Sequence, residues 1–169
     1  MPKKISEASA TAEPIQLPKL DLRLLHVRLI GDAPLICHAW STKAKKMMLD
    51  KQMKRATGAK EAKDPEKDFE DSLYPMPGGK GYGFPVIAFK AAAVDACSHV
   101  SGLTKVEARG AFHINGELVE INGKPTPRED MVRVGMGVAD IRYRGQFEHW
   151  SVDLAIRFNA GVLSAEQIV

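Results

Sequence analysis

The sequence predicts an α+β fold, in which an antiparallel sheet carries helices on one face. Three observations lead to this prediction. An early segment alternates leucine, valine and isoleucine with polar residues, a later segment rich in alanine reads as a helix, and the last third is rich in strand-forming residues. We therefore expect strands at both ends of the fold and helices between them.

Length and composition indicate one ordinary domain of a soluble protein. The chain has 169 residues, of which 44% are hydrophobic and 27% charged. No window has the apolar length of a membrane span, so a membrane is excluded as a partner. Residues 1–20 lack the apolar segment of a secretory signal and are expected to form a flexible arm, which predicts a cytoplasmic protein. Residues 21–169 are expected to form the domain.

The first elements after the arm are a strand and a helix. The strand is predicted over Leu22–Ile30. A turn then leads to a basic helix, for which Ser41 or Thr42 is available as the N-cap. One amphipathic face of this helix is predicted from apolar residues spaced i, i+4 and i+7, namely Leu49, Met53 and Ala56.

A second helix is expected where Asp64 provides a cap and Pro65 takes the first helical position. Together the two helices make residues 41–80 a charged insertion after the first strand, basic in its first half and acidic in its second. A further helix is predicted over Ala88–Ser101, closed by Gly102 in a left-handed cap.

The last third is predicted to be mostly strands. An Asn-Gly pair, Asn115 and Gly116, indicates a hairpin. Residues 131–145 and 146–158 are expected to form two more strands, joined near Gly145. Alternation in the last strand predicts a core face, composed of Trp150, Val152, Leu154, Ile156 and Phe158.

The resulting order of strand, helix, hairpin and strand fits a split β-α-β, ferredoxin-like (RRM-like) core with an antiparallel sheet. Near the end, Ser164 and Gln167 have capping-box spacing, which predicts the start of a helix and a natural chain that continues beyond Val169.

The residues give little support for catalysis. None of the five histidines lies in a local signature that joins it to a nucleophile or a paired carboxylate, so we expect a non-enzymatic protein without a cofactor. Cys37-His38 and Cys97-x-His99 are poorly spaced for one zinc ion, and no metal is expected. Both cysteines are expected to be free thiols in a reducing compartment.

Basic residues form the clearest candidate binding surface. The net charge is +3, and the predicted basic helix concentrates lysines beside a glycine-rich loop. A charge run of this kind is typical either of a solvated face or of a contact with a polyanion. The residues that we expect to contact nucleic acid are Lys43, Lys45, Lys46, Lys80, Tyr82, Lys90, Arg142 and Arg144.

The segment YGFPVIAFKAAAVDA, residues 82–96, resembles a motif in the backbone subunits of CRISPR effector complexes, which are repeat-associated RNA-binding proteins with a ferredoxin-like fold. Phe84, Pro85 and Lys90 occupy that pattern. The resemblance implies that Lys90 contacts the nucleic-acid backbone and that the insertion extends over a neighbouring subunit. The chain as a whole is also similar to uncharacterised proteins encoded by tailed bacteriophages.

From these features we expect a phage-type protein that binds single-stranded RNA or DNA and self-associates along it as an oligomer or filament. The alternative is an interaction protein from the same setting, either an assembly component or an inhibitor that mimics a nucleic-acid-binding subunit of a host protein partner. A small enzyme is the least favoured class, because no acid-base or nucleophile arrangement is present.

Overall fold

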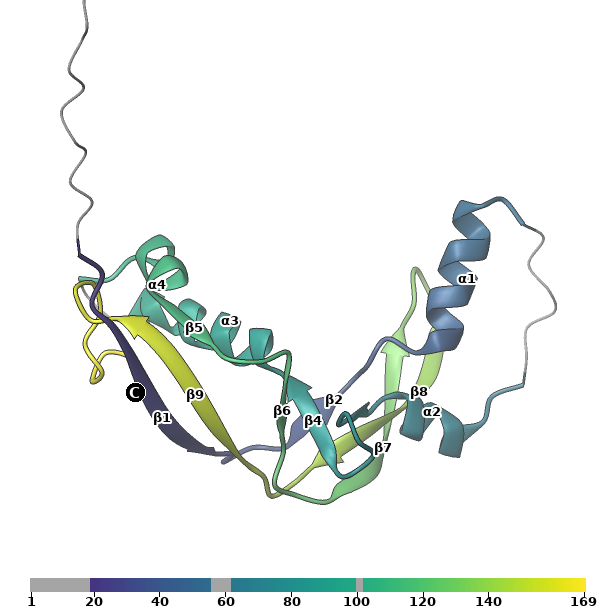
Figure 1. Ribbon diagram of the computed structural model, residues 1–169. Coiled ribbons are helices and arrows are strands. Elements are labelled where there is room, and N and C mark those ends of the chain that lie inside the picture. The colour runs from purple at the N-terminus through teal and green to yellow at the C-terminus, as the bar shows by residue number, and fades with distance from the viewer. Residues whose placement is uncertain (1–18, 56–61, 100–101) are drawn as a thin grey trace, which may run out of the picture.

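A computed structural model describes residues 19–55, 62–99 and 102–169. In this part of the chain the fold is mixed α+β, with four α-helices and three small antiparallel sheets of three strands each. Figure 1 shows that these elements form an elongated arc. One end of the arc is a sheet covered by helices, and the other end is a long hairpin beside an isolated helix.

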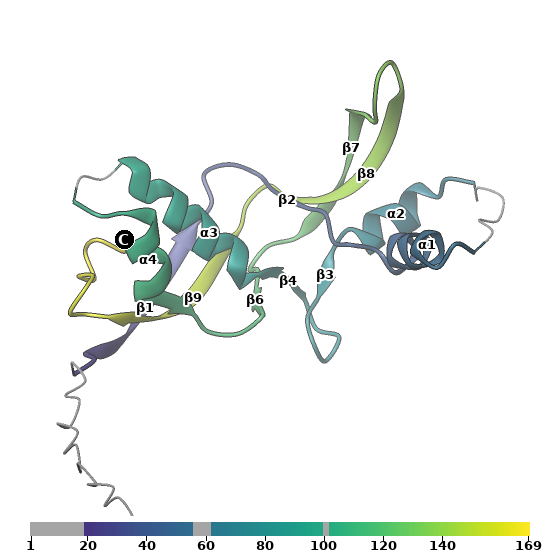
Figure 2. The same ribbon diagram turned by 90° about the horizontal axis from the view of Figure 1, so that it is seen from above.

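The covered end is built on strand β9 (Ser151–Asn159), which lies between β1 (Leu22–Ile30) and β5 (Phe112–Ile114). Both neighbours run antiparallel to β9 and are therefore parallel to each other. The chain passes from β1 to β5 by way of helices α3 (Val86–Ala96) and α4 (Lys105–Ala111). In Figure 2 both helices lie over the same face of this sheet. The predicted first strand is confirmed with the same bounds.

The core face predicted for the last strand is confirmed. Val152, Leu154, Ile156 and Phe158 are between 0% and 5% exposed. Each buried side chain of this size contributes about 1.5–3 kcal/mol relative to an exposed one. Trp150 is half-buried and packs against the same core, where its Nε1 donates to the carbonyl oxygen of Ala33 at 2.9 Å.

The middle sheet contains β8 (Ala139–Phe147), flanked by β2 (Leu35–Cys37) and β7 (Pro125–Arg133). The prediction of a single strand over residues 131–145 is wrong, because this stretch contains the turn of the β7–β8 hairpin. Gly135 and Gly137 have φ values of 111° and 78°, which glycine adopts without a steric cost. The two glycines allow the chain to reverse there.

The third sheet joins β4 (Tyr82–Pro85) to β3 (Tyr74–Pro75) and β6 (Leu118–Glu120). The predicted hairpin at Asn115 and Gly116 is therefore wrong in its pairing. Gly116 has a φ of 93° and the chain turns there, but β5 pairs with β9, whereas β6 pairs with β4.

The starts predicted for the first two helices are confirmed. Ser41 caps α1 (Thr42–Gln52) by accepting a hydrogen bond from the backbone N–H of Ala44. Asp64 caps α2 (Pro65–Asp71) in the same way through Lys67. The third predicted helix begins two residues earlier than expected, at Val86, and ends at Ala96, before the 3₁₀ turn η1 (Cys97–His99). Ser101 lies outside the described residues.

Helix α1 differs from its prediction in one important respect. The expected amphipathic face is not packed, because no residue of α1 is buried and both Leu49 and Met53 are 52% exposed. Figure 1 shows the helix at the outer end of the arc. Ala56 lies outside the described residues.

The helix start predicted near the end of the chain is wrong, because residues 165–168 form a bend and a turn and no helix follows β9 in the described residues. The capping-box contacts themselves are formed, since Gln167 and Ser164 exchange side-chain to backbone hydrogen bonds of 2.9 and 3.3 Å. Within residues 19–55, 62–99 and 102–169, no helix has the length and apolar character needed to cross a membrane.

Candidate nucleic-acid interface

The linker between β2 and α1 presents an exposed tryptophan. Cys37 ends β2 and is fully buried, while Ser41 begins the capping of α1, so only three residues connect a rigid strand to a helix. Trp40, in this linker, is 57% exposed. Lys45, one turn into α1, places its Nζ 5.6 Å from the centroid of the Trp40 ring. The ring and the ammonium group therefore form a cation–π pair at the surface.

Cys37 serves as an anchor for this linker rather than as a reactive group. Burial raises the pKa of its thiol to about 11, so the thiol is protonated at neutral pH and is a poor nucleophile. Both cysteines are free thiols in the structure.

Trp40 and Lys45 lie at a cavity of about 490 Å³ between α1, α2 and β3. Tyr74 contributes a second aromatic ring, and its hydroxyl donates to the carbonyl oxygen of His38 at 3.4 Å. Burial raises the pKa of Tyr74, with a smaller contribution from the Cys37 thiol, so the phenol remains a neutral donor. We call this cavity the Trp40 groove. Its lining residues are Ala39, Trp40, Ser41, Thr42, Lys45, Glu70, Asp71, Leu73, Tyr74, Pro75 and Leu118.

The charge of the Trp40 groove is mixed. Glu70 and Asp71 of α2 contribute carboxylates to its lining, while Lys45 contributes an ammonium group. Among the described residues, neither Lys45 nor Lys46 forms an ion pair with a carboxylate, and both side chains are exposed. Lys45 and Lys46 are thus available to an anionic ligand, and the carboxylates are available to hydrogen-bond donors.

The opposite side of the same linker borders a smaller cavity of about 210 Å³, lined by His38, Ser41, Lys63, Arg142 and Tyr143 among others. The pKa of His38 is lowered by burial and by the positive charges of Arg144 and Arg142. His38 is therefore neutral at physiological pH, because burial and the two positive charges both disfavour its protonated form.

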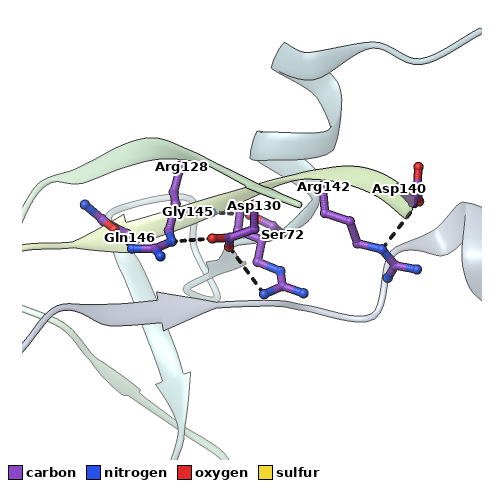
Figure 3. A network of polar contacts seen from close by, with 8 residues as sticks. Ser72, Arg128, Asp130, Asp140, Arg142, Gly145 and Gln146 are labelled. Atoms are coloured by element: carbon purple, nitrogen blue, oxygen red, sulfur yellow. Dashed lines mark hydrogen bonds and ion pairs between the residues drawn. The ribbon is translucent and has the colours of Figure 1, made fainter. Parts of the chain in front are cut away.

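Three arginines of the middle sheet, Arg128, Arg142 and Arg144, form ion pairs with aspartates (Figure 3). Arg128 and Arg144 lie directly opposite each other in the β7–β8 register, an arrangement that is destabilising for like charges. Asp130 offsets the repulsion between the two arginines, because its carboxylate accepts hydrogen bonds from Arg128 Nε at 2.8 Å and from Arg144 Nη1 at 3.4 Å. The Nε of Arg144 is buried and has no hydrogen-bond partner. Arg128 also donates to Gln146 at 3.0 Å.

Arg142 is held less firmly than Arg144. Its Nε lies 3.7 Å from Asp140, and its side chain is 39% exposed, compared with 24% for Arg144. Lys63 also donates to the Asp140 carboxylate, at 2.6 Å, and to the carbonyl oxygen of Ile141. Of the two arginines predicted to bind nucleic acid, Arg142 is therefore the one with a more accessible guanidinium.

The structure brings five of the eight predicted residues to one end of the arc. Because β2 pairs with β8 and leads directly into α1, the lysines of α1 and the arginines of β8 flank the same linker. These residues are Lys43, Lys45, Lys46, Arg142 and Arg144.

The other three predicted residues lie elsewhere. Lys80 is exposed in the turn between β3 and β4, where Gly78, Gly79 and Gly81 all have positive φ values. Tyr82 is half-buried on β4 and packs against the core. Lys90 lies on α3, in the part of the molecule that contains β5.

Lys90 is expected from the sequence to contact nucleic acid, but the structure does not leave it fully exposed. Its side chain is half-buried, with Nζ 3.1 Å from His113 Nδ1 and 5.7 Å from the centroid of the Phe112 ring. Burial lowers the pKa of Lys90, and the positive charge of Arg109 lowers it further.

Sequence reasoning missed Trp40, Tyr74 and His38. The signal for Trp40 was available, since an aromatic residue directly before a basic helix has no helical periodicity to place it in a core. No group of three metal-ligating side chains occurs in the described ranges. No protein-family model matches the chain, and neither a curated protein nor a solved structure matches it.

Proposed function

We propose that this chain binds single-stranded nucleic acid without catalysing a reaction on it, with one base stacked on Trp40. The observation that carries this proposal is the half-exposed Trp40 ring, paired with Lys45, at the Trp40 groove. Stacking needs an unpaired base, because the faces of a duplex base are already covered by its neighbours. A solvent-exposed tryptophan beside unpaired lysines is the combination that binders of single strands use.

The charges of the groove have complementary roles in this proposal. Lys45 and Lys46, with Arg142 on the far side of the linker, neutralise phosphates along the strand. Glu70 and Asp71 accept hydrogen bonds from the amino groups of bases, as carboxylates do with the cytosine amine. Most of the affinity comes from phosphates and stacking, so binding is largely independent of sequence and weakens steeply with salt.

The proposal includes a ferredoxin-like core and self-association along the strand. The β1–β9–β5 sheet supports the core, because β1 and β5 are parallel, are joined through helices, and have β9 between them, as in a split β-α-β unit. Self-association is supported by apolar side chains that nothing covers in the single chain. On the β7–β8 hairpin these are Met131, Val134, Met136, Val138 and Ile141, each at least 44% exposed.

The proposal is tested by comparing Trp40→Ala with Trp40→Phe in fluorescence anisotropy with a labelled single-stranded 20-mer. Loss of one stacked base costs about 1–3 kcal/mol, so W40A is expected to weaken binding by roughly 5-fold to 150-fold. W40F retains an aromatic face and is expected to keep most of the affinity. Lys124→Met, which changes an exposed lysine without an ion pair in the described residues, is the control. Unchanged affinity in W40A would contradict the proposal.

A second candidate function is a protein-interaction component, such as an assembly component or an inhibitor that mimics a nucleic-acid-binding subunit. The exposed hairpin apolar residues favour it, most of all Met136, which is 103% exposed. Size-exclusion chromatography with light scattering and absorbance at 260 and 280 nm separates the two candidates. A species that carries nucleic acid and dissociates as salt rises supports the strand binder, and a salt-resistant species without nucleic acid supports the interaction protein.

A further inference from the structure

A second basic site lies at the covered end of the arc, where α3 packs beside β5. A cavity of about 500 Å³ is present here, lined by Val86, Ile87, Lys90, His113 and Ile114 together with Gly116 and Glu117. Lys90 reaches this cavity from α3, and His113 reaches it from β5. One side of the cavity is therefore basic, and another is apolar.

Lys90, the lysine in the lining of this cavity, lacks a carboxylate partner. Within the described part of the chain it forms no ion pair, and its Nζ contacts the His113 ring instead. Arg109 of α4 lies close enough to lower the pKa of Lys90, although it does not line the cavity. Glu117 is the one acidic residue in the cavity lining.

The contact between Lys90 and His113 indicates what kind of ligand this cavity favours. An ammonium group is a donor only, so Lys90 donates to Nδ1 of His113 at 3.1 Å. An imidazole nitrogen is a weaker partner for an ammonium group than an anion, because it carries no full negative charge to attract the ammonium. Lowering of the Lys90 pKa by burial and by Arg109 indicates that its charge is poorly compensated.

We infer that Lys90 and His113 form a phosphate-binding site for one nucleotide, separate from the Trp40 groove. Lys90 supplies a charge-assisted donor to the phosphate, and the Nε2–H of His113 supplies a neutral one. The apolar side chains of Val86, Ile87 and Ile114 give the sugar and base a surface to cover. If the phosphate belongs to the end of a strand, this inference rests on the function proposed above. If the phosphate belongs to a free nucleotide, the inference is independent of that function.

The test is a titration of the ¹⁵N-labelled full chain with adenosine monophosphate, with adenosine as the ligand that lacks the phosphate. The monophosphate is expected to shift the His113 imidazole and β5 amide resonances saturably, and adenosine is not. Lys90→Met and His113→Gln are both expected to weaken binding, K90M by tenfold or more, while K124M leaves it unchanged. Circular dichroism of each variant confirms that the fold is retained.

No saturable shift at His113, or full affinity in both folded variants, would overturn the inference. A 20-mer with a 5′-phosphate distinguishes the two sources of the phosphate. If the 20-mer displaces adenosine monophosphate, the site binds the end of a strand. If the 20-mer does not displace it, the site binds a free nucleotide. W40A separates this site from the proposed function. Saturable monophosphate binding in W40A supports an independent site whatever happens to strand affinity, and loss of monophosphate binding there contradicts it.

Discussion

The two ends of the arc use their apolar residues in opposite ways. In the β1–β9–β5 sheet, the apolar residues of β9 face α3 and α4 and are almost completely buried. At the other end, α1 has no buried residue, and its apolar side chains Met47, Met48 and Leu49 are at least half exposed. Because burial supplies most of the folding free energy, the covered end stabilises the fold. The open end is left free to make contacts with other molecules.

This comparison predicts that equal truncations have very unequal effects at the two ends. Leu154→Ala on β9 removes a side chain that is 4% exposed and is expected to cost about 2–5 kcal/mol of unfolding free energy. Leu49→Ala on α1 removes one that is 52% exposed and is expected to cost less than about 0.5 kcal/mol. Urea denaturation followed by circular dichroism measures both. Similar losses in the two variants would mean that α1 packs against something in the folded chain.

A smaller effect is expected at the junction of the two regions, where Ser72 joins α2 to β8. Ser72 is 3% exposed, and its Oγ accepts from the backbone N–H of Gly145 at 2.7 Å. Ser72→Ala leaves that buried N–H without a partner and is expected to cost about 1–3 kcal/mol. Ser98→Ala removes an exposed hydroxyl that donates to the backbone carbonyl oxygen of Asp95. This variant serves as the matched control, and little change in unfolding free energy is expected. If the urea midpoint of S72A equals that of the wild type, the contact between α2 and β8 does not depend on this hydrogen bond.

The smallest effect is expected on the open face of the covered sheet, where Arg28 on β1 donates two hydrogen bonds to Asp153 on β9, of 2.7 and 2.9 Å. These contacts lower the pKa of Asp153 in the folded state. A lowered pKa gives stability that is present above the unfolded value of about 3.9 and is lost as the pH falls through the folded value. Asp153→Asn is therefore expected to lower the melting temperature slightly at pH 7, by a difference that shrinks as the pH falls below about 3.9. Thermal unfolding over a series of pH values from 7 downwards checks this, and a difference that does not change with pH would contradict it.

The sequence predicted best those features that depend on local pattern. The period-two alternation of β9 identified its buried face, and the capping residues Ser41 and Asp64 marked helix starts, because both signals act within a few residues. Helix α4 was missed although Thr104 and Glu107 form a capping box, since seven residues are too few to show helical periodicity.

Features that depend on distant partners were predicted poorly. Asn115 and Gly116 make a turn, but the strands on its two sides do not pair with each other. The strand before the turn, β5, pairs with β9, and the strand after it, β6, pairs with β4, and both partners are distant in the chain. In the same way, the half-burial of Lys90 depends on His113, 23 residues later. The Trp40 groove is assembled from α1, α2 and β3, and no local spacing connects Trp40 with Tyr74.

The central claim is that Trp40 stacks on an unpaired base. Its most direct test is the quenching of tryptophan fluorescence on titration with a single-stranded homopolymer, in the wild-type chain and in W40F. Trp150 is half-buried and hydrogen-bonded to Ala33, so its emission is expected to change little and to serve as an internal reference. We predict saturable quenching in the wild type, lost in W40F even though W40F still binds. Quenching of equal size in W40F, or none in the wild type under conditions where the strand is bound, would contradict the claim.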